Sequence, residues 1–249
     1  HNSLLRPLYA LRRQGIDLTI VRAGVDGRVD PDAVRAALRP ATRMIAVGHV
    51  SNVSGTIQAI DLLAAIAREA GALFLLDAAQ SAGHEMIDVR KSGIDLLAVP
   101  GHKGLFGPQG TGFLYAASTV ALKPLLAGGT GTSSASEEQP DTMPDGFEAG
   151  THNIPGIAGL KAGVEFVNAH GVGVIGAKER MLTTLAAQRL ATIPGATLHG
   201  PSDPVLRGGV LSFTMAGMDP SELAFMLDRD FDIAVRAGLH CAPQAHRTL

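Results

Sequence analysis

Short apolar segments alternate with amphipathic helical segments from residue 17 to residue 115, and no other feature of the chain constrains the fold as much. Apolar runs that are buried on both faces are typical of parallel strands, which helices connect across the faces of a sheet. The alternation therefore predicts an α/β fold with a mostly parallel sheet. The expected strands are 18–21, 44–47, 73–77, 96–99 and 112–115, and the expected helices among them are 31–39 and 59–71.

The chain changes character in its middle. Segment 128–156 is rich in Gly, Ser, Thr and Pro and is too long for a simple connection, which indicates a functional or interface loop. A long helical segment follows at 157–192, with glycine interruptions near 171–176. We expect a large domain over 1–156 and a smaller α+β C-terminal domain over 157–249. The expected strands of the smaller domain are 196–200, 210–215 and 232–235, and its expected helix is 219–229.

Composition and charge narrow the range of partners. With 249 residues, of which 46% are hydrophobic and 18% are charged, the chain is long enough to bury a core. A formal net charge of -2 and the lack of a Lys/Arg cluster argue against nucleic acid or an anionic membrane as a partner. No apolar segment approaches the ~20 residues of a membrane span, and the N-terminus lacks the apolar core of a signal peptide. A cytoplasmic location is expected.

Both ends of the chain look truncated. Leu4, Leu5, Leu8 and Leu11 have helical spacing, so the chain is expected to begin inside a helix. It stops at the letters HRTL, which carry no capping or turn signal. We therefore expect a fragment.

Cys241 is the single cysteine, which rules out an internal disulfide framework and a cysteine-cluster metal site. Gly238 and Pro243 indicate that it lies in a loop. A lone cysteine is more often a buried structural residue than a nucleophile. An ordinary thiol, with a pKa of about 8.5, is only a few per cent thiolate at neutral pH. A reactive Cys241 would therefore benefit from Arg236 or His240.

Asp77 and Lys103 each follow the carboxyl end of an expected strand. Ligand sites in open parallel sheets lie at that edge, so the two side chains are expected to face one crevice. Pyridoxal phosphate chemistry requires a lysine that forms a Schiff base and an acid that keeps the pyridine nitrogen protonated. The alternatives are a turn or helix-cap aspartate and a solvated loop lysine.

Five motifs occur in a fixed order along the chain: SNVSGTIQAI, LLDAAQSAGH, PGHKGLFGPQGTGFLY, FEAGTHNIPGIAGL and AVRAGLHCAP. Together they resemble the class V aminotransferase family of fold-type I pyridoxal phosphate enzymes, and the last resembles its cysteine desulfurase branch. The resemblance spans essentially the whole chain. It implies an enzyme that converts L-cysteine to L-alanine and leaves the sulfur on Cys241 as a persulfide.

The resemblance also implies roles for individual residues. Lys103 would form the Schiff base with the cofactor, and Asp77 would face its pyridine nitrogen. Gln80 would hydrogen-bond the phenolate oxygen of the cofactor. Asn52 would lie beside that oxygen and the substrate carboxylate, for which Arg236 is a further candidate.

Three more residues would hold the phosphate and the ring. His102 would bind the phosphate, Thr151 would reach across a dimer interface to the partner subunit's phosphate, and His1 would stack on the pyridine. A homodimer, L-cysteine or selenocysteine as substrate, a sulfur-acceptor protein and a place in iron–sulfur cluster assembly are the corresponding expectations. Alternatively, Asn52 and Gln80 satisfy turns and His102 caps a backbone group.

The other histidines show no metal-ligand spacing with a partner carboxylate, and no metal site is expected. His240 and His246 flank Cys241 and are candidates for modulating its thiol. The remaining histidines are expected to be structural: His49, His84, His152, His170 and His199.

Three departures from the family pattern concern the phosphate. The family's Gly/Thr phosphate loop would lie upstream of His1, Pro100 stands where related enzymes carry Ser or Thr, and Gly146 stands where they carry Arg. These changes predict weaker phosphate binding. The functions left open beside cysteine desulfurase are a class V aminotransferase, a selenocysteine lyase and a catalytically silent homologue.

Overall fold

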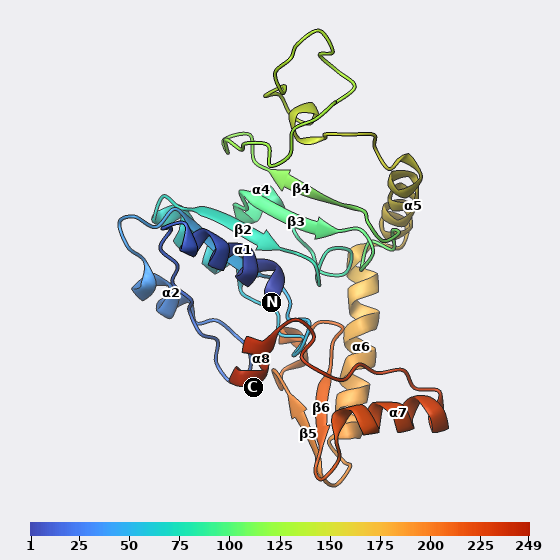
Figure 1. Cartoon of the computed structure of the whole chain (residues 1–249). Helices are drawn as coiled ribbons and strands as arrows, with labels where there is room; N and C mark the ends of the chain where they lie inside the picture. The colour runs from blue at the N-terminus through green and yellow to red at the C-terminus, as the bar shows by residue number, and fades with distance from the viewer.

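The structure, a computed structural model, describes residues 1–249 (Figure 1). Its main element is a four-stranded sheet with the strand order β1-β2-β3-β4. Strands β1 (Met44–Gly48), β2 (Leu73–Asp77) and β3 (Leu96–Pro100) are parallel, and β4 (Gly112–Ala116) is antiparallel to β3. The predicted α/β fold with a mostly parallel sheet is confirmed, as are the strands expected at 44–47, 73–77, 96–99 and 112–115.

The strand expected at 18–21 is wrong. These residues have no regular secondary structure, and their backbone forms no hydrogen bond with a sheet. Val21 alone packs against the core, whereas Ile20 is 46% exposed. The apolar residues at 18–21 therefore supply one contact with the core, through Val21, and do not form a strand buried on both faces.

The core lies between the sheet and the helices α2 (Pro31–Ala37), α3 (Ile60–Glu69) and α4 (Val89–Ser92). Alternate residues of β2, Phe74 and Leu76, are fully buried with Leu63 and Ile66 of α3. The helix boundaries follow from local chemistry. For α2, the side chain of the predicted N-cap, Asp30, accepts a hydrogen bond from the next turn, and for α3 the positive φ of Gly71 ends the helix.

The long helical segment of the sequence forms two helices, α5 (Ile154–His170) and α6 (Val172–Leu190). They separate at Gly171, whose φ of +86° is unfavourable for other residues. Gly163 of α5 packs against the carbonyl of Leu105, so that a Cβ at position 163 would collide with it. This close approach fixes α5 against the loop that carries Lys103.

A second sheet consists of two antiparallel strands, β5 (Ala196–His199) and β6 (Ser212–Met215), which confirm the strands expected at 196–200 and 210–215. Helix α7 (Pro220–Phe231) begins at the predicted N-cap, Asp219. The strand expected at 232–235 is wrong, because α7 ends with Asp232 in the left-handed conformation and an exposed irregular segment follows. The sequence also gave no sign of the short helix α8 (Pro243–Thr248), and 3₁₀ turns lie at η1 (Asp145–Phe147) and η2 (Pro204–Leu206).

Arg207 joins the second sheet to the loop at residues 50–57. Its guanidinium is 6% exposed and donates hydrogen bonds to the backbone carbonyls of Ser54, His199 and Pro201. The backbone N–H of Ile57 also donates to the carbonyl of Leu206. The C-terminal part of the chain is thereby held against the segment that carries Asn52.

Helix α1 (Asn2–Arg13) lies near the sheet, and its first turn lies close to the last residues of the chain (Figure 1). His1 is the N-cap of this helix, since its Nδ1 accepts a hydrogen bond from the backbone N–H of Ser3 at 3.1 Å. The helix expected at the start of the chain is confirmed over Asn2–Arg13. No helix of the structure combines the length and the apolar character that crossing a membrane requires.

Candidate active site

The carboxyl ends of β1, β2 and β3 lie side by side at one edge of the sheet. In the strand register Gly48 pairs with Asp77, and Asp77 with Ala98. The segments that leave these strands carry Asn52, Asp77 and Lys103, in that order. The parallel pairing therefore brings the predicted catalytic segments to the edge where open α/β sheets bind ligands.

Asp77 is half-buried, and both of its carboxylate oxygens accept hydrogen bonds. The backbone N–H of Ala79 donates to Oδ1 and the hydroxyl of Ser3 donates to Oδ2, each at 2.9 Å. The bond from Ala79 is typical of an aspartate in a turn, which was the alternative to a cofactor-binding role for Asp77. The second comes from a helix 74 residues earlier in the chain, which a local turn does not require.

Lys103 is half-buried and forms no ion pair, either with Asp77 or with another acid. The exposed Lys161, by contrast, pairs with Glu165 at 2.5 Å. The backbone around Lys103 is tightly held, because Gly104 packs on the carbonyl of Ala82 and beside the ring of His84. A fixed backbone with an unpaired amine suits a residue that reacts with a carbonyl carbon.

Gln80 and His102 have side chains that form no hydrogen bond in the structure. Gln80 is half-buried and His102 is exposed. Neither side chain satisfies a turn or caps a backbone group here, so that alternative is wrong for both. Their polar atoms are available to a ligand at the sheet edge.

Cys241 is exposed, and the expected loop is confirmed. The alternative of a buried structural cysteine is therefore wrong. Two hydrogen bonds hold this loop: Asn52 Nδ2 donates to the carbonyl of His240 at 2.7 Å, and the backbone N–H of Asn2 donates to the carbonyl of Cys241 at 2.8 Å. His240 and Cys241 both have left-handed backbone conformations, with φ of 50° and 55°, which non-glycine residues keep only when their surroundings impose them.

The imidazole of His240 lies among positive neighbours. Burial, and then the charges of Arg236 and His246, lower the pKa of His240, so its ring is mostly neutral at pH 7. The rings of His240 and His246 stack with their centres 5.8 Å apart. His240 is thus no cationic partner for the thiol of Cys241, whereas the exposed Arg236 keeps its charge.

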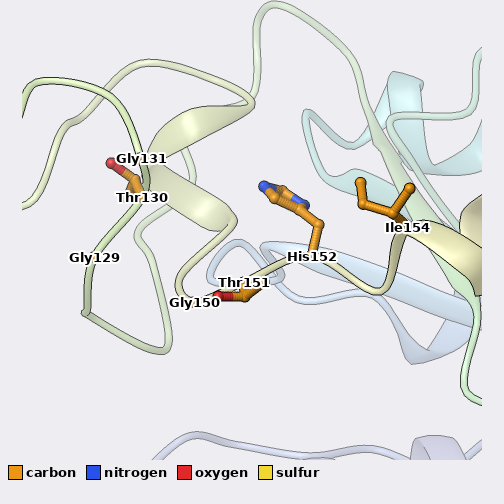
Figure 2. A pocket seen from close by; sticks show the side chains of 7 residues that line it. All are labelled: Gly129, Thr130, Gly131, Gly150, Thr151, His152 and Ile154. Atoms are coloured by element: carbon orange, nitrogen blue, oxygen red, sulfur yellow. The ribbon is translucent and has the colours of Figure 1, made fainter.

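Thr151 belongs to the largely irregular segment 117–153 between β4 and α5, called here the projecting segment because it extends away from the sheet (Figure 1). It lines a hollow of about 530 Å³ between residues 129–131 and 150–154, where the backbone N–H of Gly150 donates to the carbonyl of Gly129 at 2.7 Å. Figure 2 shows Thr130 on one side of this hollow and Thr151 and His152 on the other. No hydrogen bond joins the hollow to Asp77 or Lys103.

Several site neighbours carried no sequence signal. Ser3 is the clearest example, because only the folded chain brings it to Asp77. His84, expected to be structural, binds Glu179 of α6 through Nδ1 at 2.5 Å and contacts the Lys103 loop at Gly104. His49 is 4% exposed, its Nδ1 has no hydrogen-bond partner, and burial lowers its pKa to about 4.

The donor set at the sheet edge fits pyridoxal phosphate. The unpaired amine of Lys103, the hydrogen-bonded carboxylate of Asp77 and the free amide of Gln80 match an aldehyde, a pyridine nitrogen and a phenolate oxygen. The departures at the phosphate also have a structural basis. Pro100 ends β3, and Gly146 lies so close to the carbonyl of Pro140 that an arginine there would require a different backbone path.

An amine, an acid and an exposed thiol near the carboxyl edge of a parallel sheet are groups that cofactor-dependent group transfer uses. The family model described as "Aminotransferase class-V" matches residues 1–249, and the chain belongs to this family. Enzymes of the family depend on pyridoxal phosphate.

Curated proteins similar to this chain are named cysteine desulfurases. The chain is 41% identical over 253 residues to a probable cysteine desulfurase of Methanothermobacter thermautotrophicus, covering 100% of this chain and 63% of that protein. It is 36% identical over 248 residues to a cysteine desulfurase of Salmonella agona, covering 97% of this chain and 60% of that protein. The chain thus spans about three fifths of the length of these relatives.

Solved structures show the same similarity in three dimensions. A cysteine desulfurase from Thermococcus onnurineus, in its apo form, matches with a TM-score of 0.89 and 35% identity, covering 100% of this chain and 62% of that one. The cysteine desulfurase CsdA from Escherichia coli matches with a TM-score of 0.88 and 30% identity, covering 98% and 61%. The fold predicted from the sequence is therefore confirmed.

Proposed function

We propose that this protein is a pyridoxal phosphate-dependent cysteine desulfurase, which converts L-cysteine to L-alanine and takes up the sulfur on Cys241. One observation carries the proposal: the exposed Cys241 lies on a loop that Asn52 and Asn2 hold at the same sheet edge as Asp77. Relatives named cysteine desulfurase at 36–41% identity support it.

The residues of the sheet edge would hold the cofactor in named ways. Lys103 Nζ would bind the cofactor covalently, and Asp77 would face its ring nitrogen. Gln80 would hydrogen-bond the phenolate oxygen, and Asn52 would lie beside that oxygen. His102 would help to bind the phosphate group of the cofactor. His1, the N-cap of α1, would stack on its pyridine ring. When bound, the cofactor supplies an electron sink for the substrate carbon.

The chain's own groups then move protons and bind the substrate. Lys103 Nζ, as a free amine, would accept the α-proton of L-cysteine, because it is unpaired and its backbone is fixed by Gly104. Asp77 would face the ring nitrogen with a carboxylate whose two oxygens accept hydrogen bonds from Ala79 and Ser3. Arg236 and Asn52 are the candidates for the substrate carboxylate.

Cys241 would perform the sulfur transfer. Its thiolate attacks the sulfur of the substrate, a sulfur–sulfur bond forms, and the carbon–sulfur bond breaks with its electron pair left on the carbon. That carbon takes up a proton and becomes the methyl group of alanine, Lys103 Nζ returns a proton to the α-carbon, and Cys241 carries the persulfide. Because His240 is mostly neutral at pH 7, its imidazole can accept the thiol proton when Cys241 ionises.

The Cys241→Ala variant separates this function from aminotransferase activity. We expect release of alanine and sulfide from L-cysteine to fall by about 100-fold or more, since the nucleophile is lost. Reaction of the bound cofactor with amino acids in a half-transamination should survive. Leu239→Ala, an exposed neighbour on the same loop, is the matched control. Full desulfurase turnover by Cys241→Ala would favour an aminotransferase or lyase that needs no thiol.

The expected homodimer, sulfur-acceptor protein, role in iron–sulfur cluster assembly and cytoplasmic location belong to this proposal as well. The exposed Thr151, whose hydroxyl forms no hydrogen bond within the chain, supports the homodimer, because such a hydroxyl is available to the partner subunit's phosphate. Comparison of cysteine and selenocysteine turnover tests the selenocysteine lyase alternative, which predicts faster turnover of selenocysteine. A protein that binds no cofactor would be the silent homologue.

A further inference from the structure

The carboxylate of Asp77 has two hydrogen-bond donors from different parts of the chain. The backbone N–H of Ala79 reaches Oδ1 and the hydroxyl of Ser3 reaches Oδ2, both at 2.9 Å. An ionised carboxylate only accepts hydrogen bonds, so the shared proton with Ser3 belongs to the serine. Each oxygen keeps a further acceptor position.

Rotation of an aspartate about its last torsion is soft, because that bond joins a tetrahedral to a planar carbon. The bond from Ala79 alone leaves Oδ2 free to swing. A second donor on the other oxygen stops this rotation and sets the plane of the carboxylate. Ser3 therefore determines which direction the remaining acceptor positions of Asp77 point.

Ser3 is itself held by the N-cap of its helix, since its backbone N–H donates to Nδ1 of His1 at 3.1 Å. Its Oγ lies 2.8 Å from the same nitrogen, so the acceptors within reach of the hydroxyl proton are His1 Nδ1 and Asp77 Oδ2. The preceding residue, Asn2, donates its backbone N–H to the carbonyl of Cys241. The first turn of α1 thus touches both the acid and the loop of the nucleophile.

We propose that Ser3 is a positioning residue for Asp77: its hydroxyl orients the carboxylate and stabilises its ionised form, so that Asp77 keeps the ring nitrogen of the cofactor protonated. This inference rests on the proposed function and deepens it. A hydrogen bond to a charged acceptor favours the charged form. Without the hydrogen bond from Ser3, Asp77 holds the proton on the ring nitrogen less firmly. The ring then withdraws electrons from the substrate carbon less strongly.

The test uses the protein at its full natural length, loaded with pyridoxal phosphate that carries ¹⁵N in the ring. In the wild type the ¹⁵N signal should be that of a protonated nitrogen throughout the range of enzyme stability. For Ser3→Ala and for Ser3→Val we expect the nitrogen to lose its proton at lower pH. We also expect kcat for alanine release to fall on the order of tenfold, the effect of one hydrogen bond to a charged group. KM should stay within about twofold, because the interaction does not involve the substrate.

Matched variants separate positioning from folding. Ser3→Thr keeps the hydroxyl and should show the ring-nitrogen signal and kcat of the wild type. Ser3→Val, which has the shape of that threonine but no hydroxyl, should not. Ser221→Ala, an exposed serine in the first turn of α7 whose hydroxyl forms no hydrogen bond, should change neither. With a carbon in place of the ring nitrogen of the cofactor, wild type and Ser3→Val should turn over equally.

Two results overturn the inference alone: an unchanged ring-nitrogen titration in an active Ser3→Val variant, or equal defects in Ser3→Thr and Ser3→Val. A wild-type protein that binds no cofactor or releases no alanine would overturn the proposed function together with the inference. The outcomes are therefore distinguishable.

Discussion

The proposed site residues fall in two regions that the structure holds in different ways. Asp77 ends a strand whose residues Phe74 and Leu76 are 0% exposed, so the core fixes its backbone. Thr151 belongs to a projecting segment in which Leu125 is 97% exposed and a single backbone hydrogen bond, from Gly150 to Gly129, closes the hollow. The chemistry of the cofactor ring is thus tied to the stability of the core, whereas the phosphate contact proposed for Thr151 is not.

The largest difference should follow from replacing the lysine of the sheet edge. Lys103→Ala removes the amine that binds the cofactor and accepts the substrate proton, so alanine release should fall by about 10³-fold or more. Borohydride reduction followed by peptide mass spectrometry should label Lys103 in the wild type and no residue in the variant. Lys91→Ala, an exposed lysine of α4, is the control and should keep both activity and label. Labelling of a different lysine would contradict the assignment.

Core truncation should separate the two regions in stability. Phe74→Ala leaves a cavity in the fully buried centre of the core and should cost about 4 kcal/mol in the free energy of unfolding. Leu125→Ala in the projecting segment should change it by less than about 0.5 kcal/mol. Urea unfolding followed by circular dichroism measures both. Equal costs would show that the projecting segment is packed like the core.

Acid should destabilise the core region through His49. The pKa of this buried imidazole is lowered from 6.5 to about 4. Between these values the unfolded chain binds a proton that the folded chain does not, so stability falls as the pH drops through this window. The loss should reach up to about 3 kcal/mol at the acid end. Unfolding curves at several pH values for wild type and His49→Gln test this, with the exposed His170→Gln as control. The same pH dependence in His49→Gln would refute the assignment.

The smallest effect should come from the projecting segment. Thr151→Val removes one hydroxyl from the hollow and should weaken cofactor binding by about tenfold, without changing the free energy of unfolding. Equilibrium titration of the apoprotein with pyridoxal phosphate gives the dissociation constant. Thr119→Val, an exposed threonine of the same segment with no side-chain hydrogen bond, is the matched control. An unchanged dissociation constant in Thr151→Val would remove this residue from the phosphate site.

The parts of the fold set by local rules could be predicted from the sequence. The strands that end at Asp77 and before Lys103 are short apolar runs, and Asp30 and Asp219 cap their helices through side-chain bonds within the next turn. The sequence also identified the loop of Cys241 from its neighbouring glycine and proline. Such features depend on a few consecutive residues.

The remaining features depend on contacts between distant segments. The apolar run at 18–21 forms no strand, since burial and not composition decides strand formation. The bond from Asn52 to His240 joins residues 188 positions apart, and the bond from Ser3 to Asp77 joins residues 74 positions apart. No local pattern encodes these pairs, although they determine how the acid and the nucleophile loop are held.

Single-turnover reaction of the cofactor-loaded protein with L-cysteine tests the central claim most directly. Alanine is quantified, and Cys241 is analysed by mass spectrometry before any reductant is added. The account predicts one persulfide on Cys241 for each alanine released. Alanine released without a persulfide on Cys241 would contradict it.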